Sequence, residues 1–260
     1  MRTENATSKR FQSEEIVPAS SVRRVVAFTH IGNVRTQNED RYLIHEIDDD
    51  SCLLAVADGL GGETAGDVAA ETAISALKQI RPPAENPREQ LVTAVSAANK
   101  AIMRRVLDNM ALVGMGTTVT AVLVNKREAH WVHVGDSRLY VLRNGDLTQI
   151  TRDHTLVQFL LDEGEITPEE ALSHHSKHVL EQCVGCRYCI PESGQLTLRN
   201  GDVLVLTTDG LHDHIDPEAL KSILASRDPL RTQAKNLIEH TLSAGGKDNI
   251  TIVLATIHED

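Results

Sequence analysis

Aromatic residues are scarce in this 260-residue sequence, at 3% of the total, whereas hydrophobic residues make up 41%. Any core must therefore be built mainly from aliphatic side chains. Long apolar runs are missing too, since no segment approaches the ~18 consecutive apolar residues that a membrane helix needs. Residues 1–21 carry scattered charges and lack the apolar stretch of a secretory signal. We expect a cytoplasmic protein without a membrane span, of one large or two small domains.

Basic residues are outnumbered by acidic ones, 26 to 37, which leaves a net charge of −11. This balance argues against nucleic acid or an anionic membrane as a partner, because both would repel the protein. It is compatible with a carboxylate-rich pocket that holds cations. Internal repeats and low-complexity segments are absent.

Cysteine occurs only four times. Apart from Cys52, the cysteines form the pattern C-x2-C-x2-C, at Cys183, Cys186 and Cys189. Such spacing occurs in zinc and iron–sulfur sites. A fourth thiolate at matching spacing is missing, although three histidines lie upstream, at 174, 175 and 178. These histidines are expected to face solvent or to stand at a helix end, and not to bind a metal. The favoured interpretation is reduced, unligated thiols, with a metal site and a redox-labile pair as alternatives.

One stretch organises the chain: the apolar run 53–57, which leads directly into Asp58. A run of this kind predicts a strand buried on both faces, with Asp58 at its carboxyl end. Burying a carboxylate there is costly unless it is paired or binds a metal. Gly59, Gly61 and Gly62 allow a positive φ or a close approach of another group. If this stretch stood alone, an ordinary Asp-Gly turn would be the favoured explanation of the motif.

The same arrangement recurs at further predicted strand ends, where acidic residues stand at Glu39, Asp136, Asp209 and Asp248. If these ends converge, their mutual repulsion would be severe without cations between them. Oxygen donors alone match Mg²⁺ or Mn²⁺. Two such ions about 3.5–4 Å apart can share a water and activate it for attack on phosphorus. Arg35, near Glu39, is suited to hold the phosphate.

The remaining periodicities predict alternating blocks of strands and helices. Residues 1–21 are expected to form a flexible tail. Residues 153–193 interrupt the strands and predict a flap over the sheet, with a capping box formed by Thr167, Pro168 and Glu170. Asn144 and Gly145 predict a hairpin turn. Strands are predicted at 22–29, 117–124, 129–134, 138–142, 202–207 and 250–257, and helices at 64–80, 89–109, 217–225 and 229–243.

Seven short motifs carry a family resemblance: 35-RTQNED-40, 57-ADGLGG-62, 116-GTT-118, 135-GDSR-138, 153-DH-154, 209-DGL-211 and 248-DN-249. In this order they resemble the motifs of the metal-dependent PP2C-type (PPM) protein serine/threonine phosphatases, in their compact bacterial branch. The match runs from about residue 23 to 257. Each motif alone is weak, but all seven in the correct order are highly specific.

The resemblance implies an α+β fold, a four-layer α-β-β-α sandwich of two antiparallel sheets flanked by helix pairs. The phosphatase domain would cover residues 22–258, after the tail 1–21 and with the flap at 153–193. Two Mn²⁺ or Mg²⁺ ions would lie in a cleft at one end. Asp58 would bridge them, the carbonyl of Gly59 would bind one, and Asp209 and Asp248 would complete the other site.

By the same resemblance, Glu39 and Asp40 would hold metal-bound waters, and Asp136 with Asp209 would bind a third, weaker ion. Arg35 would clamp the phosphate and, with Asp58, serve catalysis. Some eukaryotic relatives have a histidine where this chain has Leu60, so a metal-bound water would protonate the leaving oxygen instead. The three flap cysteines are not recognised as a family feature.

The implied reaction is hydrolysis of phosphoserine and phosphothreonine in proteins by a water activated between two metals. The partners would be phosphorylated protein substrates and an opposing bacterial Ser/Thr kinase, and the chain is expected to be a monomer. Two alternatives are a catalytically inactive signalling or scaffold domain and a metallophosphoesterase of small molecules. All the metal carboxylates and Arg35 are present, which disfavours the inactive domain.

Overall fold

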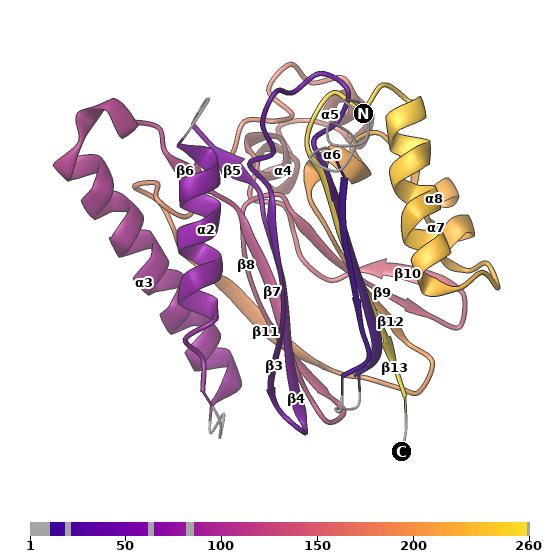
Figure 1. The fold of residues 1–260 in the computed structure, drawn as a ribbon. Coiled ribbons are helices and arrows are strands. Elements are labelled where there is room, and N and C mark those ends of the chain that lie inside the picture. The colour runs from indigo at the N-terminus through magenta and orange to yellow at the C-terminus, as the bar shows by residue number, and fades with distance from the viewer. Residues whose placement is uncertain (1–10, 19–21, 62–64, 82–85, 259–260) are drawn as a thin grey trace, which may run out of the picture.

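The computed structural model describes residues 11–18, 22–61, 65–81 and 86–258. These residues form four layers, in which two antiparallel sheets face each other and a helix pair covers each outer face (Figure 1). The predicted α-β-β-α sandwich is therefore confirmed. Within the described ranges, no helix is both long enough and apolar enough to cross a membrane.

The larger sheet has six strands and includes both ends of the described chain. Its order across the sheet is β1 (Phe11–Ile16), β2 (Val22–His30), β13 (Ile250–Ile257), β12 (Val203–Thr207), β9 (Arg138–Arg143) and β10 (Asp146–Gln149). All neighbours in it pair antiparallel.

The second sheet has five strands and contains the apolar run that precedes Asp58. Its order is β11 (Glu192–Thr197), β8 (Glu128–Val134), β7 (Val119–Asn125), β4 (Ser51–Ala57) and β3 (Arg41–Asp48). A short pair, β5 (Gly59–Leu60) and β6 (Gly116–Thr117), continues from β4 beyond the sheet.

Helices cover the outer faces of both sheets. The first pair, α2 (Gly66–Leu77) and α3 (Pro87–Asp108), lies on the five-stranded sheet. The second pair, α7 (Pro217–Leu224) and α8 (Leu230–Ser243), lies on the six-stranded sheet. The shorter helices are η1 (Met110–Leu112), α4 (Leu156–Asp162), α5 (Pro168–Leu172) and α6 (Asp209–His212).

Strand β4 is buried along its whole length because its two faces serve two different cores. Leu53 and Ala55 face helices α2 and α3, whereas Leu54 and Val56 face the other sheet. This alternation is the period of two that a strand imposes on its side chains. A third, largely aliphatic cluster fills the space between the six-stranded sheet and α7 and α8. The central strand is thus held rigidly from both sides, up to the residue before Asp58.

The predicted flexible tail is wrong for residues 11–16, which form the edge strand β1. Phe11 pairs with His30, and its ring packs edge-on against Phe28 with centroids 5.1 Å apart. The segment reads as polar because one of its faces stays exposed at the sheet edge. Residues 1–10 and 19–21 of the predicted tail lie outside the described residues.

Two local predictions are confirmed by the backbone. Asn144 and Gly145 have φ angles of 53° and 84°, the positive values that a two-residue hairpin turn requires. The capping box at the start of α5 is complete, because Thr167 accepts from the amide of Glu170 and the Glu170 carboxylate accepts from the amide of Thr167.

The favoured interpretation of the flap cysteines as reduced thiols is corrected by the structure. Cys183 and Cys186 form a disulfide, with their Cα atoms 5.2 Å apart, while Cys52 and Cys189 are free. The intervening Val184 and Gly185 form a tight turn that brings the two side chains together. Because thiols joined in a disulfide are not metal ligands, the redox-labile pair is the alternative that fits.

Leu54→Ala should destabilise the fold by about 2–5 kcal/mol, because it leaves a cavity between the sheets at a side chain with no exposure. Leu107→Ala is the matched control, since Leu107 is 78% exposed on α3. Chemical denaturation of both variants measures the difference. Equal stability of the two variants would show that the space between the sheets is not close-packed.

Candidate active site

A cavity of about 80 Å³ opens at one end of the sandwich, where strands from both sheets end. Its lining brings together most of the predicted site residues, which are far apart in the sequence: Arg35, Glu39, Asp58, Gly59, Asp136, Asp209 and Asp248. Leu60, His178, Leu180 and Asn249 complete the wall. The remaining predicted residue, Asp40, is buried and interacts electrostatically with Asp58 and Asp209.

The backbone of Asp58 is held by two threonines that the sequence interpretation left without a role. The carbonyl of Asp58 accepts from Thr117 Oγ1 at 2.8 Å and from the amide of Thr118 at 2.9 Å. Thr118 Oγ1 accepts from the amide of Asp58 at 3.0 Å and bonds Ser137 Oγ at 2.7 Å. Ser137 follows Asp136 directly, so this network couples two of the carboxylate positions.

Asp40 is placed by a chain of hydrogen bonds. Its Oδ2 accepts from Thr208 Oγ1 at 2.9 Å and from Thr251 Oγ1 at 2.7 Å. Since the single hydroxyl proton of Thr251 goes to Asp40, Thr29 must be the donor in its 2.7 Å bond to Thr251. Thr29 in turn accepts from Asn38 Nδ2 at 2.8 Å. All of these donors point toward the carboxylate and leave its Oδ1 unpaired.

Asn249 fastens the loop that carries Glu39. Its Oδ1 accepts from the amide of Glu39 at 2.8 Å, and its Nδ2 donates to the carbonyls of Ile31 and Gln37 at 2.9 Å each. A Cβ on Gly66 would come within 2.9 Å of Glu39 Oε2, so only glycine allows α2 to begin against this carboxylate. Neither Asn249 nor Gly66 was assigned a role from the sequence.

Arg35 reaches the rim of the cavity from the loop after β2. Its Nη2 donates to Asp248 Oδ2 at 2.6 Å, and about half of its side chain remains exposed. The guanidinium therefore keeps donors free for an anion while Asp248 orients it. This position agrees with the one expected for a phosphate-binding arginine.

Burial and mutual repulsion disfavour the ionised form of these carboxyl groups. Burial, reinforced by the charges of Asp40 and Asp209, raises the pKa of Asp58 well above its ordinary value. Burial also raises the pKa of Asp40 to about 7, although hydroxyl bonds from two threonines oppose the shift. The pKa values of Glu39, Asp136 and Asp209 are raised as well, in each case first by burial.

In three of these carboxylates, one oxygen atom is placed so that a bound cation would relieve the repulsion. Glu39 Oε1, Asp40 Oδ1 and Asp209 Oδ1 are buried and have no hydrogen-bond partner among the described residues. Leaving such oxygens unpaired is costly unless a cation binds them. A set of oxygen donors beside unpaired buried oxygens fits hard divalent ions such as Mn²⁺ or Mg²⁺.

The segment 153–193 contributes a side chain at the rim of the cavity that stays largely exposed, as the sequence interpretation expected. His178 lines the cavity, and its Nδ1 lies 3.1 Å from Asp213 Oδ2. Ligand atoms of His178, Asp209 and Asp213 lie within 4.8 Å of one another. The residues around His178 in the sequence do not predict its position at the cavity, because that position depends on a contact between the flap and the distant residue Asp213.

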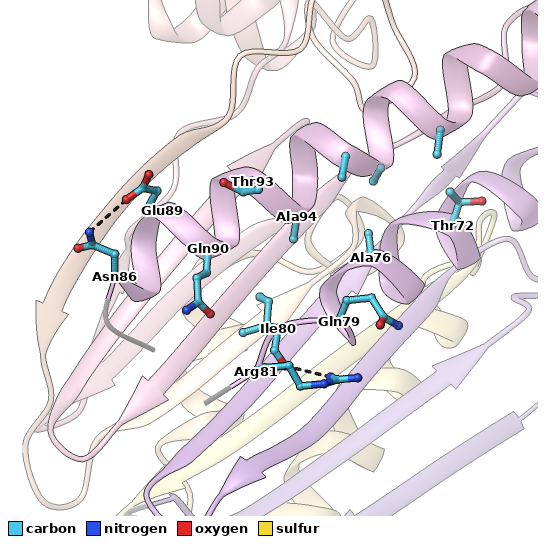
Figure 2. Close-up of a pocket in the computed structure, with 13 residues that line it drawn as sticks. Thr72, Ala76, Gln79, Ile80, Arg81, Asn86, Glu89, Gln90, Thr93 and Ala94 are labelled. Atoms are coloured by element: carbon cyan, nitrogen blue, oxygen red, sulfur yellow. Dashed lines mark hydrogen bonds between the residues drawn. The ribbon is translucent and has the colours of Figure 1, made fainter. Parts of the chain in front are cut away.

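A second pocket, of about 700 Å³, lies between α2 and α3 (Figure 2). Small side chains such as Ala76 and Ala94 line much of it. Its charged residues are engaged locally, because Arg81 donates to the carbonyl of Ile80 and Glu89 accepts from Asn86. Among its described lining residues, only Glu89 carries a carboxylate, so this pocket lacks the grouped acidic side chains of the smaller cavity. We therefore place the candidate active site in the smaller cavity.

The site and the fold agree with one known family. The sequence model described as Protein phosphatase 2C matches residues 29–245. The chain therefore belongs to the protein phosphatase 2C family, as the order of its motifs predicted.

Named relatives cover most of the chain. Serine/threonine protein phosphatase PstP of Mycobacterium tuberculosis (strain H37Rv) is 40% identical over 238 residues, 91% of this chain but 45% of PstP, so the chain spans about half of that relative. Protein phosphatase PhpP of Streptococcus pneumoniae (strain R6) is 35% identical over 240 residues, 89% of this chain and 96% of PhpP. A solved PstP catalytic domain in complex with two manganese ions is 36% identical, with a TM-score of 0.80 over 96% of this chain and 99% of that one.

Asp58→Asn should stabilise the metal-free protein near pH 8 but not near pH 4. A carboxyl group whose pKa rises on folding contributes its full stabilisation below its ordinary pKa of 3.8. This stabilisation is lost as the pH rises through the pKa that the group has in the folded protein. Each pKa unit corresponds to about 1.4 kcal/mol. For a domain of this size, 1 kcal/mol raises Tm by roughly 2–4 °C.

Thermal unfolding of chelator-treated protein at the two pH values measures this effect. Asp49→Asn, which changes an exposed turn, is the control and should shift neither Tm. A lower Tm of Asp58→Asn at pH 8 would contradict the repulsion between the site carboxylates.

Proposed function

We propose that this chain hydrolyses phosphoserine and phosphothreonine in proteins with the help of two divalent cations. The observation that carries the proposal is the convergence of acidic side chains and one arginine on a single cavity. Membership of the protein phosphatase 2C family supports it, as do relatives named serine/threonine phosphatases.

Asp58, the carbonyl of Gly59, Asp209 and Asp248 would hold the two cations, while Glu39 and Asp40 would bind their waters. When bound, such ions lower the pKa of a coordinated water and supply positive charge to the transferring phosphoryl group. The unpaired oxygens of Glu39, Asp40 and Asp209 give these ions ready partners. The manganese bound to the PstP catalytic domain makes Mn²⁺ a suitable first ion to test.

A third cation would bind between Asp136 and Asp209. Burial and the charge of Asp209 raise the pKa of Asp136, so a cation there would relieve the repulsion between these two groups. Asp213 adds a further negative charge beside both carboxyls.

The residues of the chain itself would bind and orient the substrate. Arg35 would donate to the phosphoryl oxygens while Asp248 keeps its guanidinium in place. The asparagine and threonine network would hold the carboxylates in position, because each of its bonds ends on a loop that carries one of them. Preorganised charges of this kind are a main source of enzymatic rate enhancement.

The opposing partner would be a Ser/Thr kinase, since such a kinase produces the phosphoprotein substrate. Because kinases use ATP, both reactions would take place in the cytoplasm. We propose that the chain acts as a monomer, because this one chain supplies every residue expected to hold the cations and the phosphate.

Metal-stripped protein should release no phosphate from a phosphothreonine peptide, and added Mn²⁺ or Mg²⁺ should restore release. Asp58→Asn should lower kcat/KM by about a hundredfold or more, because Asp58 is the carboxylate that would hold both cations. Asp49→Asn should behave like the wild type. A malachite green assay of released phosphate measures all three proteins.

Release that persists after chelation would contradict the requirement for metal. Failure with every metal would favour the inactive scaffold, and hydrolysis of nucleotides but not of the phosphopeptide would favour a small-molecule phosphoesterase.

Arg35→Ala should raise KM for the phosphopeptide roughly tenfold or more and change kcat less, because a charge-assisted hydrogen bond to phosphate is worth about 1.5–3 kcal/mol. Arg227→Ala, at an exposed position between α7 and α8, is the control. Steady-state kinetics separate the two parameters. A large fall in kcat with unchanged KM would show that Arg35 acts on the transition state and not on substrate binding.

A further inference from the structure

We propose that Cys183 and Cys186 form a thiol–disulfide exchange site that sets the position of the flap and takes a dithiol as its reductant. The regulatory part of this proposal rests on the proposed phosphatase function. Its chemistry rests on the disulfide itself, on the contacts of that disulfide with β6, and on hydrogen bonds that lead from there to Asp58.

The disulfide encloses a residue that pairs with the active-site strand. Val184, between the two cysteines, exchanges both backbone hydrogen bonds with Thr117 of β6, at 2.9 and 2.8 Å. Thr117 Oγ1 then donates to the carbonyl of Asp58 at 2.8 Å. The redox-active loop is therefore joined to the backbone of a predicted metal ligand through one intervening residue.

Packing around the disulfide leaves it little freedom. A Cβ on Gly116 would lie 2.7 Å from Cys183 Sγ, so this sulfur occupies the space that a side chain on β6 would need. Gly185 takes a φ of 99° and donates to Asn99 Oδ1 of α3 at 2.6 Å. These contacts tie the base of the flap to α3 and β6.

The two cysteine residues differ in exposure, and this difference favours attack on Cys186. Cys183 is only 3% exposed, whereas Cys186 is partly exposed. One thiolate of the dithiol would attack Cys186 Sγ, forming a mixed disulfide and expelling Cys183 as a thiolate. The second thiolate of the dithiol would then release Cys186 and close its own disulfide. Two electrons and two protons pass from the dithiol to the two cysteines.

Reduction would loosen the part of the flap that borders the cavity. Leu180, three residues before Cys183, lines the cavity, as does His178. Once the cross-link is open, the turn at Val184 and Gly185 is held by hydrogen bonds and packing, without a covalent bond. The reduced flap would therefore order the bound phosphopeptide less well, without loss of the carboxylates that hold the cations.

The first measurement is chemical and needs no activity. Full-length protein treated with oxidised dithiothreitol should show two thiols when titrated in guanidinium, those of Cys52 and Cys189, against four after reduction. Hydrogen exchange by mass spectrometry should show faster exchange around Thr117 and Val184 in the reduced protein. Four thiols after oxidation, or identical exchange in the two states, would overturn the exchange site.

The second measurement is kinetic. Reduction should raise KM for the phosphothreonine peptide roughly threefold to tenfold, the scale expected for loss of loop ordering. Calorimetric affinity for Mn²⁺ should stay unchanged. Cys186→Ser should show the reduced-state KM under both treatments, whereas Cys189→Ser, the matched control, should keep the response to dithiothreitol.

Equal KM values in both redox states, or a response abolished by Cys189→Ser, would contradict the proposal that the disulfide sets the position of the flap. If no phosphate is released in either state, the proposed function fails. The thiol count and the hydrogen exchange would then still decide whether the exchange site exists.

Discussion

The repulsion among buried carboxylates at one end of the sandwich is the constraint on which the rest of the structure depends. The charges of Asp40, Asp136 and Asp209 all act on Asp58, so ionising any of these groups raises the cost of ionising the others. A flexible chain would move such groups apart. Here the cores on both faces of β4 and the antiparallel pairing of β12 with β13 hold the strand ends in place. The fold therefore maintains a concentration of negative charge that favours cations over a collapsed, neutral pocket.

The strands, turns and caps around the site were largely predictable from the sequence, because they depend on the pattern of neighbouring residues. The uninterrupted apolar run before Asp58 predicted a strand with two buried faces, and the structure confirms it. The capping box at Thr167 and the turn at Asn144 also depend only on neighbouring residues. The recurrence of an aspartate at successive strand ends predicted that these groups would meet, and the cavity contains them.

What escaped prediction depends on contacts between distant segments. Strand β1 lies at a sheet edge, and its exposed face reads like a tail. The hydroxyls of Thr208 and Thr251 carry no sequence signal until β12 and β13 pair and bring them to Asp40. The position of His178 depends on how the flap folds back, and the partner of Cys183 could not be chosen among three cysteines by spacing alone.

The hydrogen bonds around Asp40 connect this carboxylate to two separate segments of the chain. Asn38 Oδ1 accepts from the amide of Asp40, and its Nδ2 starts the chain through Thr29 and Thr251 that returns to Asp40 Oδ2. The bonds thus form a closed, homodromic circuit, in which every dipole points the same way around and strengthens the next. The loop before β3 and the strand β13 are therefore joined by one set of hydrogen bonds, and the unpaired Oδ1 of Asp40 is a point at which a bound cation would act on that set.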